Sequence, residues 1–574
     1  MSNRSDCSAQ RIAAASAHLP LEPISRTERW TAALLLLAAF ALRCFYIFRF
    51  RYDSDEPQHL HTTWNWTQGL LQYRDFFDNH TPLFHLLFSP LVAAIGERPD
   101  ILTFMRFAMV PLWVVSLWAV WKLGSRLFSR RAGLWAAVFI ALLPWWFFPA
   151  LEYRTDNLWT PLWLCALVVL LGGRLGGWRA FAGGLILGVA ACVSMKTSLL
   201  VSVSALAAVM SLFCARRWDS ITLVRAAKIT APLAAGMLLA PAAVCAFFAA
   251  KGCWVDFYYC VIQHNTLPNV DAKVHPWTER LAFPIALPFL LFLAVQIARR
   301  AATPALAVRW SFLFLFTGLY YVSLDSFWAL LTRQDYLPFY PLAAVLAAPG
   351  ILWLAAKTRP SRRAALLAGL GCAEILLILG GRPPQIDGTA DQRELLRQVL
   401  QLTQPGEWVM DFKGQSVFRR RAFHYVIEPL TDSRMKRGII QDTIAEDLAQ
   451  KGVCVVVNRQ RWYREETFRF LGENYLAAGQ VRVAGRILVP TATVPEQTLS
   501  FPVAIPARYV LWSENKPVHG LLDGLPYDGA RLLAPGPHTF RPEGAYNRLT
   551  LLWERAAAEG CFPDAAQPGW LYEH

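Results

Sequence analysis

Several features that would assign a common enzyme class are missing from this 574-residue chain. No glycine-rich phosphate motif follows a strand pattern and opens a helix, so nothing in the sequence indicates a nucleotide-binding loop. The eleven cysteines lack the spacing of a metal site, and there is no internal repeat or low-complexity tract. The residues before Trp30 contain neither an early apolar core nor a small-residue cleavage site, which excludes an ordinary cleaved secretory signal.

Charge is also scarce, at 17% of residues, whereas 55% of the residues are hydrophobic and 13% are aromatic. With a mean hydropathy of +0.31, the chain is too apolar for one soluble globule. Runs long enough to cross a hydrocarbon core of roughly 30 Å recur near 30–50, 101–121, 132–150, 157–172, 180–195, 198–214, 229–250, 281–298, 306–324, 336–356 and 363–380. The sequence therefore predicts a polytopic α-helical membrane protein with about eleven transmembrane helices.

The composition changes after Gly380, where "GRPPQIDGTADQRELLRQVL" opens a charged region of about 190 residues that has room for its own core. Helix and strand patterns alternate at first and predict an α/β domain with some parallel pairing. Short strands and turns follow and predict a small β-sandwich. The predicted segments are a tail at 1–29, a transmembrane domain at 30–383, an α/β domain at 384–495 and a β-rich domain at 496–574.

Clusters of Lys and Arg fall in every second loop, beginning with Arg26 and Arg29 before the first predicted helix. Because cytoplasmic loops keep positive charge, the tail is predicted to be cytoplasmic. Segments 51–100 and 251–280 are then outward loops, and the C-terminal domains are extracytoplasmic, as in a multi-pass protein of the inner (plasma) membrane. The same clusters explain much of the net charge of +15, so a nucleic-acid partner is not expected.

Unusual polar residues gather on the predicted outward side. These are Asp53, Asp55 and Glu56 in "RYDSDEPQHL", Arg154 and Asp156 in "YRTDNLW", Lys196 in "SMKTSLL", and Arg333 and Tyr336 in "LTRQDYLPFY". Ionisable groups beside a bilayer are costly and usually mark a functional site. The alternatives are helix capping or a solvated flank for the acids, an Arg154–Asp156 ion pair, snorkelling for the cations and an aromatic belt for Tyr336.

Five motifs, in the order that the family has them, resemble those of the GT-C polyprenyl-phosphate-dependent glycosyltransferases, a family that includes protein O-mannosyltransferases and the aminoarabinose transferases of lipid A. They are Asp55-Glu56, "HTPLFHLL", "YRTDNLW", "GLILGVAACVSMKTSLL" and "RQDYLPFYPLAAVLAA", spread over residues 30 to 380. The resemblance implies a GT-C fold in which the transmembrane domain is catalytic. It also implies a polyprenyl-phosphate-linked sugar donor and a glycolipid, polysaccharide or protein acceptor.

Sugar transfer from a polyprenyl phosphate needs a base for the acceptor proton and cations for the departing phosphate. The resemblance implies that Asp55 is this general base in an inverting transfer, with Glu56 supporting it or binding metal. Three cations at outward helix ends, Arg154, Lys196 and Arg333, are expected at the phosphate. Asp156 and Tyr336 are further substrate-binding candidates.

His80 is a substrate-binding candidate at a position where the chain departs from the family. It carries Asn79-His80 where the aminoarabinose transferases carry a Glu-Lys pair, which leaves the donor sugar open. Glu56, His80 and His264 are also candidate ligands of a divalent metal ion, the one cofactor considered. No two-His spacing is diagnostic, so ordinary hydrogen-bonded histidines remain the alternative.

Two other functions are considered: a transporter or flippase of lipid-linked sugars, and a non-catalytic sugar-binding membrane protein. A transporter predicts ionisable residues at mid-bilayer and a two-fold repeat of broken helices, and the sequence shows neither. A non-catalytic protein would have the same composition, although retention of Asp55 favours an enzyme. The acceptor class, metal dependence and oligomeric state are left open by the sequence.

Overall fold

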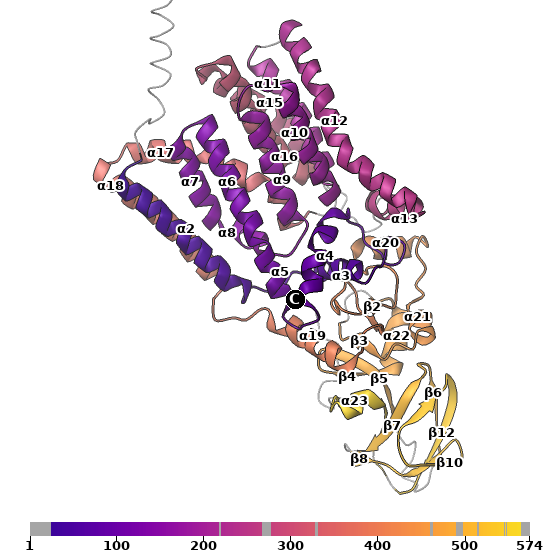
Figure 1. The fold of residues 1–574 in the computed structure, drawn as a ribbon. Coiled ribbons are helices and arrows are strands. Elements are labelled where there is room, and N and C mark those ends of the chain that lie inside the picture. The colour runs from indigo at the N-terminus through magenta and orange to yellow at the C-terminus, as the bar shows by residue number, and fades with distance from the viewer. Residues whose placement is uncertain are drawn as a thin grey trace, which may run out of the picture.

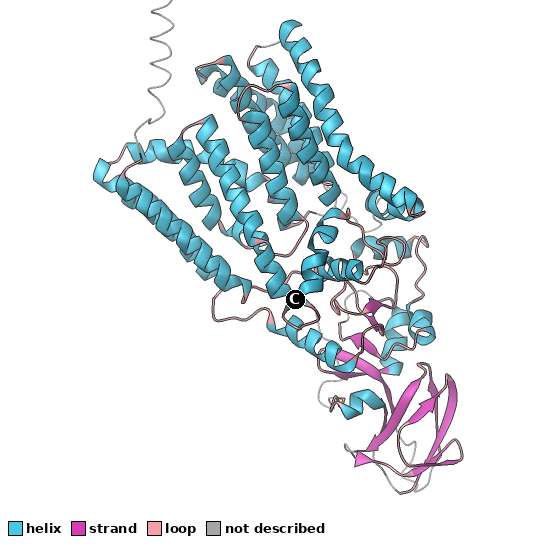
Figure 2. Cartoon of the chain, viewed as in Figure 1, coloured by secondary structure: helices cyan, strands magenta, loops and turns pink. Residues whose placement is uncertain are grey.

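The computed structural model describes residues 24–216, 220–266, 277–327, 331–459, 463–488, 498–513, 516–544, 546 and 548–563. Most of the predicted cytoplasmic tail, residues 267–276 of the second predicted outward loop and the end of the predicted β-rich domain lie outside these residues. The described chain forms a large helical bundle followed by a smaller domain that contains the strands (Figures 1 and 2).

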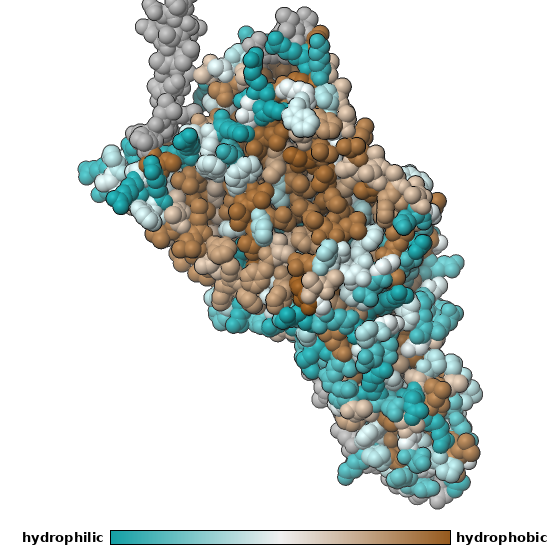
Figure 3. Space-filling view, viewed as in Figure 1, coloured by the Kyte–Doolittle hydropathy of each residue, from teal (hydrophilic) through white to brown (hydrophobic). Residues whose placement is uncertain are grey.

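Eight helical segments within the described residues are long and apolar enough to cross a membrane. They are α2 (Arg26–Ile47), α5 (Ile101–Ala108) with α6 (Val110–Leu127), α11 (Thr197–Cys214), α12 (Ser220–Ala250), α15 (Trp277–Arg300), α16 (Pro304–Phe327), α17 (Phe339–Ala356) and α18 (Pro360–Gly381). Their apolar side chains form a broad belt over the bundle, above a largely hydrophilic C-terminal domain (Figure 3). The prediction of a polytopic helical membrane protein is confirmed.

The three other predicted spans are helical but depart from a straight crossing. α7 (Arg130–Leu142) is followed by α8 (Pro144–Phe147) and the 3₁₀ turn η1 (Pro149–Leu151), and the pair is bent by 70°. Pro144 lacks the amide proton needed to continue the α7 ladder. α9 (Asp156–Leu171) and α10 (Gly177–Val193) have 16 and 17 residues, fewer than the roughly 20 of a full span. Of about eleven predicted spans, eight therefore qualify among the described residues, or nine with the bent pair.

Glycines set the contact between α10 and α12. A Cβ atom on Gly184 would lie 2.0 Å from the Leu233 carbonyl oxygen, and one on Gly188 would lie 2.4 Å from that of Met237. Small residues let helix backbones approach closely inside a membrane, where apolar side chains gain little from each other. The glycine-rich motif thus sets the position of α10 against α12, and Lys196 follows shortly after the end of α10.

Shorter helices lie at the end of the bundle that faces the C-terminal domain (Figure 1). They are α3 (Asp55–Thr67), α4 (Leu83–Ile95), α13 (Trp254–Tyr258), the π-helical turn η2 (Tyr259–Gln263), α14 (His264–Thr266) and the 3₁₀ turn η3 (Arg333–Tyr336). All of them belong to segments predicted to face outward. Ten consecutive residues of α3, from Glu56 to Asn65, are buried, so α3 is enclosed on all sides over most of its length.

The C-terminal domain begins with α19 (Ala390–Leu402) and an α/β segment. Its elements are β1 (Trp408–Met410), β2 (Arg420–Arg421), α20 (Pro429–Lys436), α21 (Ile444–Gln450), β3 (Val455–Val457), α22 (Glu465–Asn474), β4 (Tyr475–Ala478) and β5 (Val481–Leu488). β1 pairs in parallel with both β2 and β3, which confirms the predicted parallel pairing. β3 pairs antiparallel with β5, so the sheet is mixed.

The remaining strands continue this sheet and add a second one. They are β6 (Leu499–Val503), β7 (Ala507–Ser513), β8 (Lys516–Pro517), β9 (Gly520–Leu522), β10 (Leu525–Tyr527), β11 (Arg531–Leu533), β12 (Gly536–Pro542) and β13 (Leu549–Trp553), followed by α23 (Glu554–Ala558). The long sheet runs β11-β7-β13-β5-β3-β1-β2, and the second runs β10-β9-β12-β6. Because β13 pairs with β5, segments on both sides of the predicted 495/496 boundary share one sheet and one apolar core.

The C-terminal domain is attached to the bundle through several direct contacts. Arg419 donates from Nη1 to Glu97 Oε2 at 2.9 Å, and the Gly388 amide, on the segment that leads to α19, donates to the Arg49 carbonyl at 2.9 Å. Val417 and Phe418, which are fully buried, belong to the apolar core of the bundle although they lie in the C-terminal domain. The two parts therefore form a continuous interface, and the end of α3 lies at it.

Candidate active site

The acids of "RYDSDEPQHL" form the turn that begins α3. The Asp53 carboxylate accepts from the Asp55 amide at 3.2 Å, and the Glu56 carboxylate accepts from the Asp53 amide at 2.8 Å. Carboxylates are favoured in the first turn of a helix because they satisfy free amides and face the positive end of its dipole. These contacts are all within this turn, so the local structure alone accounts for three neighbouring acids at the start of α3.

Glu56 is fully buried and has protein donors on both oxygens. Arg106 donates to Oε2 at 2.7 Å and to Oε1 at 2.5 Å, and the Tyr153 amide donates to Oε2 at 2.9 Å. Arg106 and Glu56 therefore form a fully buried ion pair. In this arrangement Glu56 ties the start of α3 to α5 and to the segment that carries Arg154.

Asp55 lies beside Glu56 but has a different environment, with 21% of its side chain exposed. Arg154 Nη1 is 2.7 Å from Oδ2, and Lys413 Nζ contacts Oδ1. Burial by itself raises the pKa of this carboxyl, but the charges of Arg154 and Lys413 outweigh it and hold the pKa well below its usual range. Asp55 is therefore an ionised carboxylate in the resting protein.

Arg154 is the centre of the charge network. Its Nη1 is 2.6 Å from Asp53 Oδ1, and its Nε is 3.4 Å from Asp156 Oδ2 and 4.0 Å from Glu152 Oε2. The predicted Arg154–Asp156 ion pair is thus present, but as one contact among four carboxylates. A single guanidinium can orient several acids because its donors are held in one plane.

Asp156 continues the network to Lys196. Lys196 Nζ is 2.9 Å from Asp156 Oδ1 and 2.7 Å from Asp335 Oδ1. Burial lowers the pKa of this amine, but the two carboxylates outweigh the effect and raise it, so Lys196 stays charged. Residues from three predicted outward segments are therefore joined through Lys196.

Arg333 and Tyr336 lie on η3 but outside this network. The Arg333 side chain is exposed and makes no ion pair within the described chain, whereas Gln334 donates to Glu152 Oε2 at 2.7 Å. The Tyr336 ring packs against those of Tyr321 and Tyr340, with centroids 5.6 and 6.1 Å apart. Of the three predicted phosphate cations, Arg333 is therefore the one that has no carboxylate partner among the described residues and can bind an anion without breaking an ion pair.

His80 lies in a polar group from the first predicted outward loop. Its Nδ1 donates to Asp78 at 2.9 Å, and its ring centroid lies 4.6 Å from that of His59. Burial lowers the pKa of His80, but the Asp78 carboxylate outweighs burial and raises it. The neighbouring Asn79 amide donates to Glu428 at 3.1 Å. The segment that departs from the family pattern thus contacts the C-terminal domain.

The three candidate metal ligands do not form one ligand set. Glu56 is paired with Arg106, and His80 with Asp78. The His264 ring packs on Phe77, and burial followed by the nearby Arg434 charge lowers its pKa to about 3. Among the residues that the structure describes, no group of three or more His, Cys, Asp or Glu side chains could hold a metal ion. The residues present therefore do not fit a metal centre built on these candidates.

Three further ionisable residues, to which the sequence did not point, lie at the site: Glu152, Lys413 and Glu428. Glu152 is buried, and burial and the nearby Asp53 charge raise its pKa well above the usual range. Lys413 and Glu428 come from the C-terminal domain and lie 3.7 Å apart between Nζ and Oε2. Lys413 lies 358 positions from Asp55, so no local spacing could have indicated this contact.

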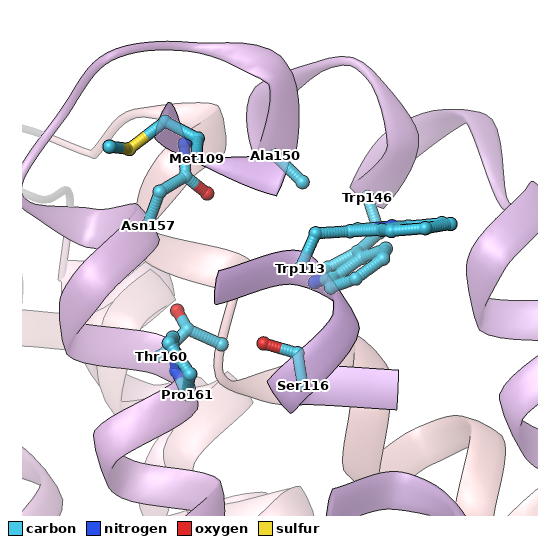
Figure 4. Close-up of a pocket in the computed structure, with 8 residues that line it drawn as sticks. All are labelled: Met109, Trp113, Ser116, Trp146, Ala150, Asn157, Thr160 and Pro161. Atoms are coloured by element: carbon cyan, nitrogen blue, oxygen red, sulfur yellow. The ribbon is translucent and has the colours of Figure 1, made fainter. Parts of the chain in front are cut away.

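A small cavity lies next to this network, inside the bundle. Its volume is about 10 Å³, and its lining residues are Met109, Trp113, Ser116, Trp146, Ala150, Asn157, Thr160 and Pro161. Ser116 and Thr160 face each other across it, with the Ser116 hydroxyl oxygen on the side toward Thr160 (Figure 4). This volume suits about one water molecule and is far too small for a sugar.

The fold is similar to that of ArnT from Cupriavidus metallidurans. Its apo structure matches at 13% identity with a TM-score of 0.55, covering 80% of this chain and 98% of that one. The structure of the same protein bound to undecaprenyl phosphate matches at 13% identity and a TM-score of 0.53, covering 79% and 97%. The apo oligosaccharyltransferase of Archaeoglobus fulgidus gives 13% identity and a TM-score of 0.42, covering 74% and 69%.

Comparison at the level of sequence adds nothing to this likeness. No family model matches the chain, and no curated protein matches it. The apolar helices and the ArnT-like arrangement nevertheless agree with the fold predicted from the motifs. The chain is a multi-pass membrane protein with the GT-C fold.

Proposed function

We propose that this protein is a glycosyltransferase that moves a sugar from a polyprenyl-phosphate donor to an acceptor hydroxyl on the extracytoplasmic side of the inner membrane. The observation that supports this most is the partly exposed Asp55 carboxylate, held between cations at the end of a GT-C bundle. The similar ArnT fold has been determined with undecaprenyl phosphate bound, which supports a lipid-linked donor.

In the proposed reaction, the acceptor hydroxyl gives its proton to the Asp55 carboxylate. The acceptor oxygen forms a bond to the anomeric carbon while the bond from that carbon to the phosphate oxygen breaks. The electron pair of the broken bond leaves with the polyprenyl phosphate, which therefore departs with the additional negative charge. Attack from the face opposite the phosphate inverts the anomeric centre, and one base is sufficient because phosphate is a good leaving group.

The cations divide into two groups in this mechanism. Arg154 contacts Asp53 and Asp55 and keeps the base ionised and oriented. Arg333, which is exposed, and Lys196, with 22% of its side chain exposed, are the groups proposed to meet the phosphate. Positive charge fixed where negative charge develops stabilises the transition state without reorganisation.

The finer assignments are also proposals. The N-terminus is cytoplasmic and the C-terminal domain extracytoplasmic, in agreement with the Lys and Arg distribution. The acceptor is a glycolipid, a polysaccharide or a protein, and His80 with Asn79 is proposed to contact the donor sugar. Because the candidate ligands do not come together, no step of the mechanism uses a metal ion.

The test is sugar transfer by membranes that contain the wild-type chain, Asp55→Asn or Asp391→Asn. The membranes receive labelled polyprenyl-phosphate sugars and an envelope extract as acceptor. Asp391 is a matched control, because it is an exposed acid in the first turn of α19. Transfer by the wild type and Asp391→Asn but not by Asp55→Asn, at equal protein levels, is the expected result. Equal transfer by all three removes Asp55 as the base, and transfer by none, across several donors, contradicts the proposed function.

A further inference from the structure

The contact between Lys413 and Asp55 depends on a rigid loop. We call residues 411–417 the docking loop, which follows β1 in the C-terminal domain. The buried Asp411 carboxylate accepts from the Gly414 amide at 2.8 Å and from the Ser416 amide at 2.9 Å, which folds the loop back on itself. A side-chain carboxylate that bonds amides three and five residues later fixes a loop without regular structure.

The docking loop is seated on α3. His61 donates from Nδ1 to the Val417 carbonyl at 2.8 Å, and a Cβ atom on Gly414 would lie 2.6 Å from His61 Cβ. Val417 itself is fully buried in the core of the bundle. The backbone that carries Lys413 is therefore held against the helix that carries Asp55, so a change of partner by Lys413 requires rotation of its side chain alone.

Lys413 has two carboxylates within reach. Its Nζ contacts Asp55 Oδ1 and lies 3.7 Å from Glu428 Oε2, and both Lys413 and Glu428 have 13% of their side chains exposed. The other charged or titratable groups that act on Asp55 include Arg154, His59 and His80. Those that act on Glu428 include Asp55, His80, Asp78, Arg421 and Arg434. Glu428 is thus the one carboxylate besides Asp55 that the described structure places beside the ammonium of Lys413.

Proton transfer changes the balance between these two partners. Once Asp55 has taken the acceptor proton it is neutral, and its attraction for an ammonium is lost. A buried ammonium without a counter-charge is costly, so Lys413 requires another anion at that moment. A lysine ammonium on a flexible stem can change partners with a rotation, whereas a guanidinium held by several bonds cannot do so easily.

We propose that Lys413 is a positioning residue of the transfer reaction that alternates between two carboxylates, binding Asp55 in the resting protein and Glu428 when Asp55 carries the acceptor proton. The C-terminal domain thereby supplies part of the active site. This inference rests on the proposed function, because it assigns the proton to Asp55. It adds a role for two residues that lie outside the membrane bundle.

The test measures the pH profile of transfer by full-length protein in lipid nanodiscs, with the donor sugar identified by the first experiment. Four variants are compared with wild type: Lys413→Met, Glu428→Gln, the double variant, and Lys436→Met as the control. Lys436 pairs with Asp432 at 3.0 Å on α20, so the control removes a lysine from the same domain. Thermal unfolding of each variant identifies any that fail to fold.

Two results are expected. Without Lys413 the pKa of Asp55 rises, so the acid limb of kcat/KM moves to higher pH by about one unit or more. Glu428→Gln lowers kcat by about tenfold, because Lys413 has no carboxylate to move to, and this loss disappears when Lys413 is also replaced. Lys436→Met leaves both the limb and kcat unchanged.

If Lys413 and Glu428 had only a structural role, the losses of activity in the two single variants would add in the double variant. If Glu428→Gln costs the same in both backgrounds, or if the acid limb does not move in Lys413→Met, the alternating lysine is wrong while the transferase assignment stands. If Lys413→Met does not fold, Lys413→Arg is measured in its place, because it keeps the positive charge beside Asp55. The acid limb of its kcat/KM profile must then stay near that of wild type. Absence of transfer by the wild type contradicts the proposed function itself.

Discussion

Two neighbouring carboxylates at the start of α3 show how one turn can place two acids in different environments. Glu56 and its partner Arg106 are both fully buried, and the remaining Glu56 contacts are to backbone amides of the bundle. Asp55 is 21% exposed, and its partners come from two domains. An acid with all of its acceptor positions used by a buried scaffold is fixed, whereas an exposed acid paired with a movable ammonium can still accept a proton.

The largest expected effect separates these two acids by activity. Asp55→Asn should lower transfer by about 10²–10⁴-fold, the usual contribution of a general base, and should leave the melting temperature near that of wild type. The measurement is kcat of purified protein together with thermal unfolding. An Asp55→Asn protein that retains more than a tenth of wild-type activity would break the comparison, because both acids would then be structural.

Glu56→Gln should reverse this pattern and act on stability first. Removing one partner of a fully buried ion pair leaves Arg106 uncompensated, at a cost of about 3–5 kcal/mol. We expect a lower yield of folded protein and a lower melting temperature, with transfer per folded molecule much less affected than in Asp55→Asn. Glu394→Gln, at an exposed pair with Arg397, is the matched control and should change stability by less than about 1 kcal/mol. An unchanged melting temperature in Glu56→Gln contradicts the assigned role.

The pH dependence of stability tests the contact between α3, which carries Asp55, and the docking loop. His61 is buried between α3 and the docking loop, and burial lowers its pKa to about 4. The unfolded chain binds a proton near the ordinary value of about 6.5 while the folded chain does not, so folding is favoured above pH 6.5 and loses stability as the pH falls toward 4.

Between pH 7 and pH 5 the free energy of unfolding is expected to fall by about 2 kcal/mol. Hydrogen exchange should show this as weaker protection of the docking loop. His61→Gln keeps a donor for the Val417 carbonyl but cannot titrate, so it should remove most of this pH dependence. A wild-type docking loop whose protection does not change between pH 7 and pH 5 would show that His61 does not control the contact.

The smallest expected effect comes from the backbone of the docking loop. Gly414 has a φ of +85°, and a Cβ there would meet His61 at 2.6 Å, so Gly414→Ala should weaken docking by about 1–3 kcal/mol and reduce transfer. Gly406 has a φ of +89° but has open space around it, which makes Gly406→Ala a control for backbone strain alone. Transfer kinetics and hydrogen exchange check both variants. Equal effects in the two would show that contact with α3 is unimportant.

The sequence was sufficient for the elements whose signals are local. Long apolar runs predicted the membrane helices because a hydrocarbon core requires about 20 such residues in series. The acids in the first turn of α3 were visible for the same reason, since capping acts within four residues. Among the described residues, eight or nine of the predicted spans have full length, because α9 and α10 are short and α7 bends before Pro144, and hydropathy averaged over a window does not register such a break.

The tertiary structure decided which charges meet. Long-range ion pairs such as Arg154 with Asp55, Lys196 with Asp335 and Lys413 with Asp55 depend on how separate segments pack, and no local pattern encodes that packing. The different environments of Asp55 and Glu56 have the same origin, because Arg106 and Lys413 reach them from opposite parts of the chain. The sequence by itself determined a membrane bundle with acids at its predicted outward end, and the packing of two domains determined which of those acids is fully buried and which stays partly exposed.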